Sequence, residues 1–297
     1  MRPQKSLRDE LQFITEFGSL LDVMQQAAIS KLRGVEERSA SQAALTELLS
    51  RDCFPLLPDA ARSHPLLRSE GRGQLLVVLT SDEGMVGPLH AAVVRQALSR
   101  AAHDTQWLCI GQRGSRLLGR MAAHRRVLPL PKEENAEQEL QRVSAEILAQ
   151  FTREGLREAW LLAPRFLSMT RQDVAVHQLL PLPVSWSVRD ADEREHLFEP
   201  SLDRVVDQLA AAWVHHLCVE TFWSARRAEF AARAHHVEDA RQELAKRTKT
   251  VRHEFFKILH ERVDVLVRET CLVQRRLVRS RSQERIPGIG TARAGVR

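Results

Sequence analysis

The hydrophobic pattern of the last third of the chain predicts one very long helix. Residues 201–286 contain neither Gly nor Pro, the two residues that most often end a helix. Glu199-Pro200 precedes this segment and Pro287-Gly288 follows it. An uninterrupted helix of this length spans roughly 130 Å, which is several times the width of an ordinary domain.

An apolar residue recurs at every seventh position of this predicted helix. The series starts at Trp223 and Phe230 and continues through Val237, Leu244, Val251, Ile258, Val265 and Leu272. Such spacing keeps one seam of a helix apolar, as in one half of a coiled coil. The positions that would complete the seam are mostly polar, as at Arg227 and Arg241. The apolar stripe is therefore narrow, and we expect one slender partner.

The first residues of the chain predict that partner. From Ser6 to about Leu49 the same interval recurs, with apolar residues at Leu7, Ile14, Leu21, Ala28 and Val35. Gly18 and Gly34 each weaken a helix by about 1 kcal/mol relative to Ala without ending it. Two seams at opposite ends of one chain can pair as an antiparallel coiled coil when the residues between them fold into a unit whose ends lie together.

Between the two helices the hydrophobic period changes. A Pro-punctuated linker at 54–65 leads to short apolar runs at 75–80, 107–110, 127–130 and 159–163, which predict strands. Amphipathic helices are expected at 89–102, from about 115, and at 132–153. An edge strand is predicted at 179–184, because Pro is tolerated only at a sheet edge. Short buried strands that alternate with helices indicate an α/β domain with a mainly parallel sheet.

These elements divide the chain into four segments. They are an N-terminal helix at 1–55, an α/β domain at 66–198, a C-terminal helix at 201–286 and a basic tail at 287–297, which we expect to be flexible. The predicted fold class is α/β, with a long antiparallel coiled coil of the N- and C-terminal helices. A Rossmann-like α/β domain is inserted between these helices.

The excess positive charge lies at the C-terminal end of the chain. The net charge of +6 is matched by residues 275–297 alone, which hold seven arginines and one acidic residue, Glu284. The tail therefore leaves open a second class of function, a basic coiled-coil adaptor that binds nucleic acid through its arginines. The cysteines are far apart and no apolar run approaches the ~20 residues of a membrane span, which favours a cytosolic chain.

Three motifs resemble functional sites but have a simpler interpretation. The loop from Ser81 to Gly87 follows a predicted strand, as a phosphate-binding turn does, but it carries two carboxylates that would repel phosphate. In the P-loop-like stretch from Gly114, Arg120 and Met121 replace the residues that bind phosphate and magnesium. His253 and His260 are too far apart for one zinc. We expect no catalytic residue, cofactor or metal, although a nucleotide-binding enzyme stays a third alternative.

A series of short motifs in collinear order resembles the gamma subunit of F-type rotary ATP synthases. The motifs are Ser6-Leu7-Arg8, Met24 with 27–32, Leu76–Gly87, Ile110-Gly111, Phe166 with Gln178–Pro183, and Phe198-Glu199-Pro200. After Ser224 the chain reads Ala225–Phe230 in place of the family's Ser-Glu and Met-rich helix, and it ends in an arginine-rich tail. These departures suggest a divergent bacterial lineage.

The resemblance implies a non-catalytic rotor shaft that couples ion flow through the membrane sector to ATP synthesis or hydrolysis on the alpha/beta ring. It implies as partners the alpha and beta subunits of F1, the epsilon subunit and the membrane c-ring, without direct nucleotide or nucleic acid binding. It also implies a peripheral location at the cytoplasmic face of the bacterial inner membrane. The matching subunit-contact positions are Met24, Ser30, Lys31, Arg252 and His253.

Overall fold

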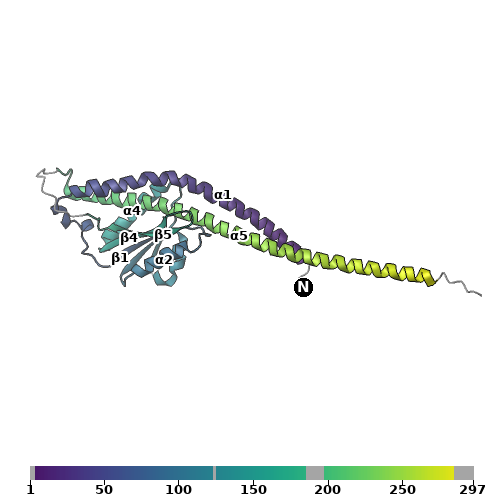
Figure 1. Cartoon of the computed structure of the whole chain (residues 1–297). Coiled ribbons are helices and arrows are strands. Elements are labelled where there is room, and N and C mark those ends of the chain that lie inside the picture. Colours follow the sequence, from purple (N-terminus) through teal and green to yellow (C-terminus); the bar gives the residue numbers. More distant parts are fainter. Residues whose placement is uncertain (1–3, 123–124, 185–196, 284–297) are drawn as a thin grey trace, which may run out of the picture. The chain divides into compact units, whose positions relative to one another are not determined.

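The computed structural model of the chain describes residues 4–122, 125–184 and 197–283. Its helices are α1 (Gln4–Leu48), α2 (Leu89–Arg100), α3 (Gln112–Leu118), α4 (Ala136–Arg153) and α5 (Leu202–Gln283). Its strands are β1 (Gln74–Leu79), β2 (Thr105–Ile110), β3 (Arg125–Leu128), β4 (Glu158–Phe166) and β5 (Gln172–Leu180) (Figure 1). The predicted tail at 287–297 lies outside the described residues.

The chain divides into two compact units. The sheet unit comprises residues 21–240, and the terminal unit comprises residues 1–20 with 241–297. Both long helices contribute residues to both units, so the compact units cut across the segments predicted from the sequence. The Pro-punctuated linker folds into short 3-10 turns at Phe54–Leu56, Asp59–Ser63 and Pro65–Leu67.

The sheet has the strand order β3-β2-β1-β4-β5. Strand β1 pairs in parallel with β2 and with β4, and β2 pairs in parallel with β3. Every residue of β1 is buried, as expected for a strand with helices on both faces. The predicted mainly parallel sheet is therefore confirmed.

The edge strand was predicted too late in the chain. The observed β5 runs from Gln172 to Leu180 and pairs antiparallel with β4. The strand ends just before Pro181 and Pro183, because a residue without a backbone N–H cannot continue a hydrogen-bonded ladder. The apolar residues after Leu180 instead begin the connection toward α5.

Helices cover both faces of the sheet (Figure 1). On one face Val93 and Ala97 of α2 and Leu118 of α3 pack with Leu76 and Val78 of β1. On the other face, residues of α4 and the middle of α5 share a core cluster with the remaining β1 side chains, namely Leu75, Val77, Leu79, Leu140, Ile147, Phe222 and Phe230. The sheet unit is thus a three-layer α/β structure with α5 as part of its core.

The N- and C-terminal helices form an antiparallel coiled coil, as predicted. In the terminal unit, Leu7 and Ile14 cluster with Val251, and Arg247 binds Glu10 at 2.6 Å. In the sheet unit, Gln25 donates to Glu238 at 2.8 Å and Arg227 pairs with Glu36. Within each unit, residues further along α1 meet residues earlier in α5, which defines the antiparallel direction.

The predicted apolar seam of α5 continues beyond the residues of α5 that contact the described part of α1. Arg262 already meets Gln4 at 2.6 Å, the first described residue of α1. Beyond that point Val265 is 51% exposed and Leu272 is 57% exposed. Their seven-residue spacing continues, but the described part of α1 offers them nothing to pack against.

Candidate functional site

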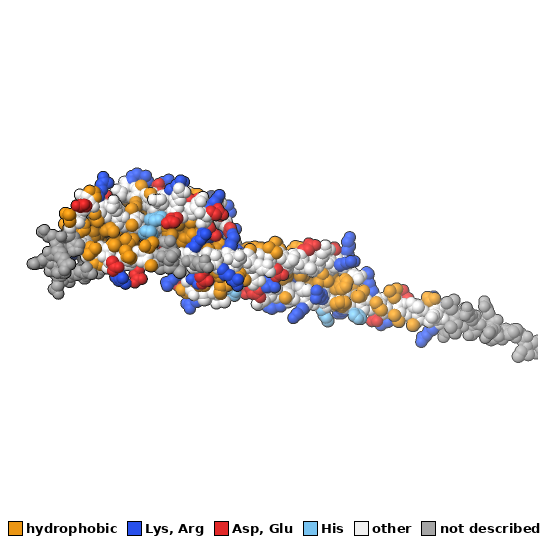
Figure 2. Space-filling view, turned by 90° about the horizontal axis from the view of Figure 1, so that it is seen from above, with side chains coloured by type: hydrophobic (Ala, Val, Ile, Leu, Met, Phe, Trp, Pro, Cys, Tyr) orange, Lys and Arg blue, Asp and Glu red, His pale blue; other side chains and the backbone are white. Residues whose placement is uncertain are grey.

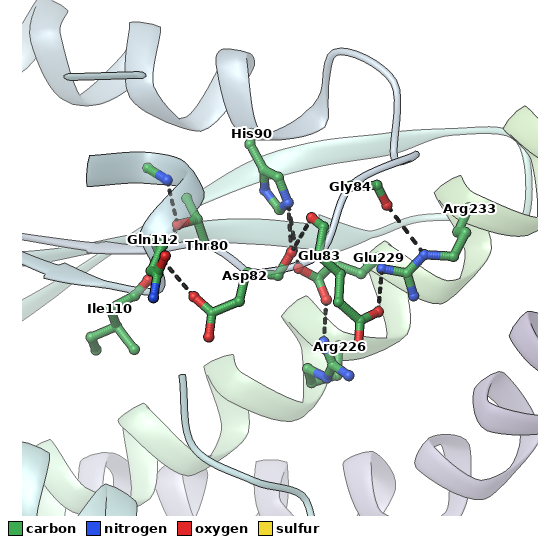
Figure 3. Close-up of polar contacts among 12 residues, drawn as sticks. Thr80, Asp82, Glu83, Gly84, His90, Ile110, Gln112, Arg226, Glu229 and Arg233 are labelled. Atoms are coloured by element: carbon green, nitrogen blue, oxygen red, sulfur yellow. Dashed lines mark hydrogen bonds and ion pairs between the residues drawn. The ribbon is translucent and has the colours of Figure 1, made fainter. Parts of the chain in front are cut away.

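The topology of the sheet makes the carboxyl end of β1 the expected position of a ligand site. The crossovers proceed from β1 through β2 to β3 on one side and then return to β4 on the other side of β1. In open α/β sheets, ligands bind in the crevice that forms at such a reversal of strand order. In this chain the residues at that place belong to the loop after β1, to α2 and α3, and to α5 (Figure 3).

The amides at the start of α3 are satisfied by the loop after β1. The N–H of Gln112 donates to Asp82 Oδ1 at 2.6 Å and the N–H of Arg113 donates to Ser81 O at 3.1 Å. The N–H of Gly114 donates to Thr80 Oγ1 at 2.8 Å. Free amides at a helix start are what a phosphate site requires. The chain uses these donors itself, in agreement with the prediction of a structural turn.

A buried carboxylate from α5, Glu229, lies at the centre of the crevice (Figure 3). Its exposed fraction is 2%, and it forms an ion pair with Arg226 one turn earlier in α5. Arg226 is also buried and reaches Glu133, before α4, at 2.7 Å and 3.1 Å through two guanidinium nitrogens. Burial raises the pKa of Glu229, whereas Arg226, the nearby Ser81 hydroxyl and then Arg233 counteract that rise.

Arg233, a further turn along α5, binds the loop that follows β1. Its guanidinium group lies 2.8 Å from the Glu83 carboxylate and donates from Nε to the carbonyl of Gly84 at 3.4 Å. Val86 and Leu89 pack against Ala228 and Ala232 of the same helix. The loop is therefore held to α5 by both charge and apolar contact.

His90 of α2 completes this polar cluster. Its Nε2 lies 2.8 Å from Ser81 Oγ and 3.6 Å from Glu229 Oε1, while Nδ1 has no hydrogen-bond partner in the described structure. A proton on Nε2 is the neutral form that suits these two oxygen atoms. Burial, together with the charges of Arg113, Arg233 and Arg226, lowers the pKa of His90 to about 4.

The crevice has no space left for a small molecule. Beside Thr80, Pro164 and Phe222, the side chains of Arg226 and Glu229 leave no volume that would hold a water molecule. Helix α5 thus fills the position at which a sheet of this topology would hold a ligand. We call the residues Ser81, Glu83, His90, Glu133, Arg226, Glu229 and Arg233 the polar junction.

A groove next to the polar junction brings two of the predicted contact residues together. Its volume is about 370 Å³, and Met24 and Lys31 line it from α1, spaced so that they share one helix face. The remaining lining residues come from the loop after β1 and from α3, α5 and α1, and include Glu83, Gly84, Met85, Arg113, Arg233, Ala27 and Ala28. Met85 has a positive φ of 62°, which is uncommon for a residue other than Gly.

The other predicted residues are distributed over both units. Ser30 is exposed on α1, and Arg252 and His253 are exposed on α5 in the terminal unit. Among the seam residues, Leu7, Ile14, Leu21, Val237 and Val251 are buried, Leu244 and Ile258 are partly buried and Val265 is exposed. Of the described residues, no group of three or more His, Cys, Asp or Glu side chains could hold a metal.

The polar junction was missed by the sequence analysis. Its charged residues on α5 were given no role in the sequence analysis, yet Arg226, Glu229 and Arg233 are all buried. The available signal was their spacing of three and four residues, which places them on the same helix face as Phe222. A charged residue on the face of a buried aromatic residue requires a buried partner.

Comparison with known proteins gives consistent matches. A family profile described as ATP synthase matches residues 4–257. The ATP synthase gamma chain of Ralstonia nicotianae is 25% identical over 248 residues, which cover 78% of this chain and 85% of that one. The gamma chain of Cupriavidus necator is also 25% identical, with the same coverage.

Solved structures share the fold at low sequence identity. A chain of the Euglena gracilis mitochondrial ATP synthase, in a structure of its OSCP, F1 and c-ring, matches with a TM-score of 0.68 and 13% identity, covering 98% of this chain and 99% of that one. A chain of the Tetrahymena thermophila central stalk and c-ring matches with a TM-score of 0.58 and 17% identity, covering 74% and 99%. None of the described helices is long and apolar enough to cross a membrane.

Proposed function

The chain belongs to the ATP synthase gamma-chain family, and we propose that it is the central shaft of a rotary ATP synthase. The observation that carries this function is the antiparallel pairing of the N- and C-terminal helices within each unit, with an α/β sheet inserted between them in the sequence. Paired helices of this kind suit a shaft, and the sheet unit suits attachment of that shaft to a neighbouring subunit.

The proposed mechanism is transfer of torque between the membrane sector and a ring of alpha and beta subunits. A shaft whose faces differ can stabilise a different state of each catalytic subunit as it turns, so that rotation and ATP chemistry are coupled through differential contacts. Figure 2 shows that hydrophobic and charged side chains are mixed along the surface of the helical part. The chain itself would be non-catalytic, and ATP synthesis or hydrolysis would take place on its partners.

Contact with the alpha and beta subunits is proposed for Met24, Ser30 and Lys31, and for Arg252 and His253 further along the shaft. In favour of Met24 and Lys31 is the groove of about 370 Å³ that they line. Within the described part of the chain, Lys31 and Arg113 form no ion pair, whereas Glu83 is already paired with Arg233. Two available cations beside Met24 and Met85 suit a segment that carries both carboxylate and apolar side chains.

The remaining partners follow from the same role. We propose that the sheet unit binds the membrane c-ring and the epsilon subunit, because a rotor must be fixed to the ring that drives it. The chain would then be peripheral at the cytoplasmic face of a bacterial inner membrane. The bacterial origin of the similar gamma chains supports this location.

Co-expression with the alpha and beta subunits of the same cell tests the proposed function. We expect a stoichiometric complex that hydrolyses ATP and survives gel filtration. The matched control is a chain without residues 1–55, which lacks α1 and should fail to assemble. If the intact chain purifies apart from both subunits under conditions that assemble a conventional gamma chain, the shaft function is wrong.

A further inference from the structure

We propose that the crevice at the carboxyl end of β1 is an anion-binding site whose occupant is the chain's own Glu229 carboxylate. This carboxylate projects from α5 into the position that a ligand occupies in a sheet of this topology. The carboxylate then acts as an internal ligand that fixes α5 to the sheet. This inference concerns the sheet unit alone and does not depend on the proposed function.

The groups around Glu229 are those of a carboxylate site. Arg226 supplies a guanidinium group in direct contact with one carboxylate oxygen. His90 Nε2 faces Oε1 at 3.6 Å, and Ser81, whose hydroxyl donates to the Glu83 carbonyl oxygen at 3.0 Å, lies 2.8 Å from the same ring nitrogen. Arg233 adds a second positive charge nearby. Guanidinium and imidazole groups that converge on one buried position are suited to an oxyanion.

The same residues could be mistaken for a serine hydrolase triad. In such a triad, the acid binds the ring nitrogen opposite the one that contacts the serine. Here Ser81 and Glu229 both face Nε2 of His90, and Nδ1 has no hydrogen-bond partner in the described structure. Ser81 is also completely buried, so no substrate could reach it. The geometry therefore suits anion binding and does not suit nucleophilic catalysis.

One carboxylate joins three parts of the sheet unit. Through Arg226 it connects to Glu133 ahead of α4, and through His90 it connects to α2 and, by way of Ser81, to the end of β1. Loss of this anion would leave Arg226 and Arg233 as buried cations with incomplete neutralisation, which is costly. Glu229 is therefore a positioning residue for the attachment of α5 to the sheet.

Chemical rescue of the full-length Glu229→Ala chain tests the proposal. This substitution removes a group with the same heavy atoms as acetate, so acetate can re-enter the vacated site. We expect Glu229→Ala to lower Tm by about 10 °C, since removal of one partner from a buried ion pair is strongly destabilising. Sodium acetate should recover much of this loss in a saturable way, relative to sodium chloride at equal ionic strength.

The matched control is Glu243→Ala, which removes an exposed carboxylate of the same helix. Its Tm and that of the parent chain should be the same in acetate and in chloride. Equal melting of Glu229→Ala in the two salts would overturn the proposal. If Glu229→Ala does not fold, Glu229→Gln decides, because it preserves the shape and removes the charge. A Tm equal to that of the parent would then show that no anion is needed, whereas a clear fall would support an anionic ligand.

Discussion

Protonation of His90 makes the stability of the polar junction depend on pH. Its pKa is lowered from 6.5 to about 4 because it is buried close to Arg113, Arg233 and Arg226. Between these two values the unfolded chain binds a proton that the folded chain does not, so stability falls as the pH falls from about 6.5 to 4. The full shift corresponds to about 3 kcal/mol.

We predict that His90→Gln weakens this loss of stability in acid. Urea unfolding of the full-length chain at pH 7 and pH 4.5 should give a smaller difference for the variant than for the parent. His103→Gln, which replaces a fully exposed histidine, is the matched control and should behave as the parent does. Burial raises the pKa of Glu229, so this group acts in the opposite sense, and the comparison between variants isolates the histidine. An unchanged pH dependence in His90→Gln would contradict the prediction.

Lys31 permits a functional test that does not disturb the fold. Its side chain is exposed and forms no ion pair within the described part of the chain, although it lies 5.5 Å from the Phe230 ring centroid. Lys31→Ala should therefore change the free energy of unfolding by no more than about 0.5 kcal/mol. In the assembled complex we expect a lower ratio of ions pumped to ATP hydrolysed. Arg95→Ala, exposed on α2, should leave that ratio unchanged, and an unaltered ratio in Lys31→Ala would remove the proposed contact.

At the scale of elements, the periodic helices were predictable and the last strand was not. The seven-residue repeat is local in sequence, and both α1 and α5 lie close to their predicted bounds. Strand β5 depends on its pairing with β4 for recognition, since its own residues from Gln172 to Gln178 mix polar and apolar types and most of them are only partly buried. The prolines after β5 are the stronger local signal, and for this reason the edge strand was predicted at 179–184, around these prolines.

The polar junction could not be predicted for a related reason. Its residues come from positions near 81–90, 133 and 226–233, and no spacing in the sequence indicates that these segments meet. In the sequence analysis, the loop after β1 was compared with a phosphate-binding turn and interpreted as a structural turn, because its carboxylates oppose phosphate. The path of α5 along the sheet, which brings Glu229 into the crevice, was not predicted from the sequence.

The seam of the terminal unit offers a prediction for this element. Val251 is fully buried with Leu7 and Ile14, whereas Val265 is 51% exposed although it occupies the same seven-residue register. Val251→Ala should lower the local stability of the terminal unit by about 2 kcal/mol. Val265→Ala in the isolated chain should have almost no effect. Hydrogen exchange of amides in residues 4–20 measures this difference, and similar exchange rates in the two variants would show that the seam does not hold α1.

At the scale of the whole molecule, the proposed shaft carries apolar surface that the described chain does not cover. Beyond Arg262, the exposed residues of α5 include Val263, Leu266, Val267 and Val273. Exposed apolar residues that gather on one element indicate a surface for a partner. In a rotary enzyme that partner would be the ring of alpha and beta subunits. This part of α5 is therefore the stretch whose loss should affect assembly most.

The arginine-rich end should be dispensable for that assembly. Arg275 and Arg276 are exposed, and Pro287-Gly288 is unsuited to a regular helix. Guanidinium groups cannot be buried inside a ring without partners, and exposed ion pairs add only about 0 to 1 kcal/mol each. We predict that a chain ending at Arg279 assembles with alpha and beta subunits and retains most ATP turnover, whereas a chain ending at Arg262 loses both. Gel filtration and ATPase assays of the two truncations check this, and failure of the longer one would make the arginines a structural bearing of the shaft.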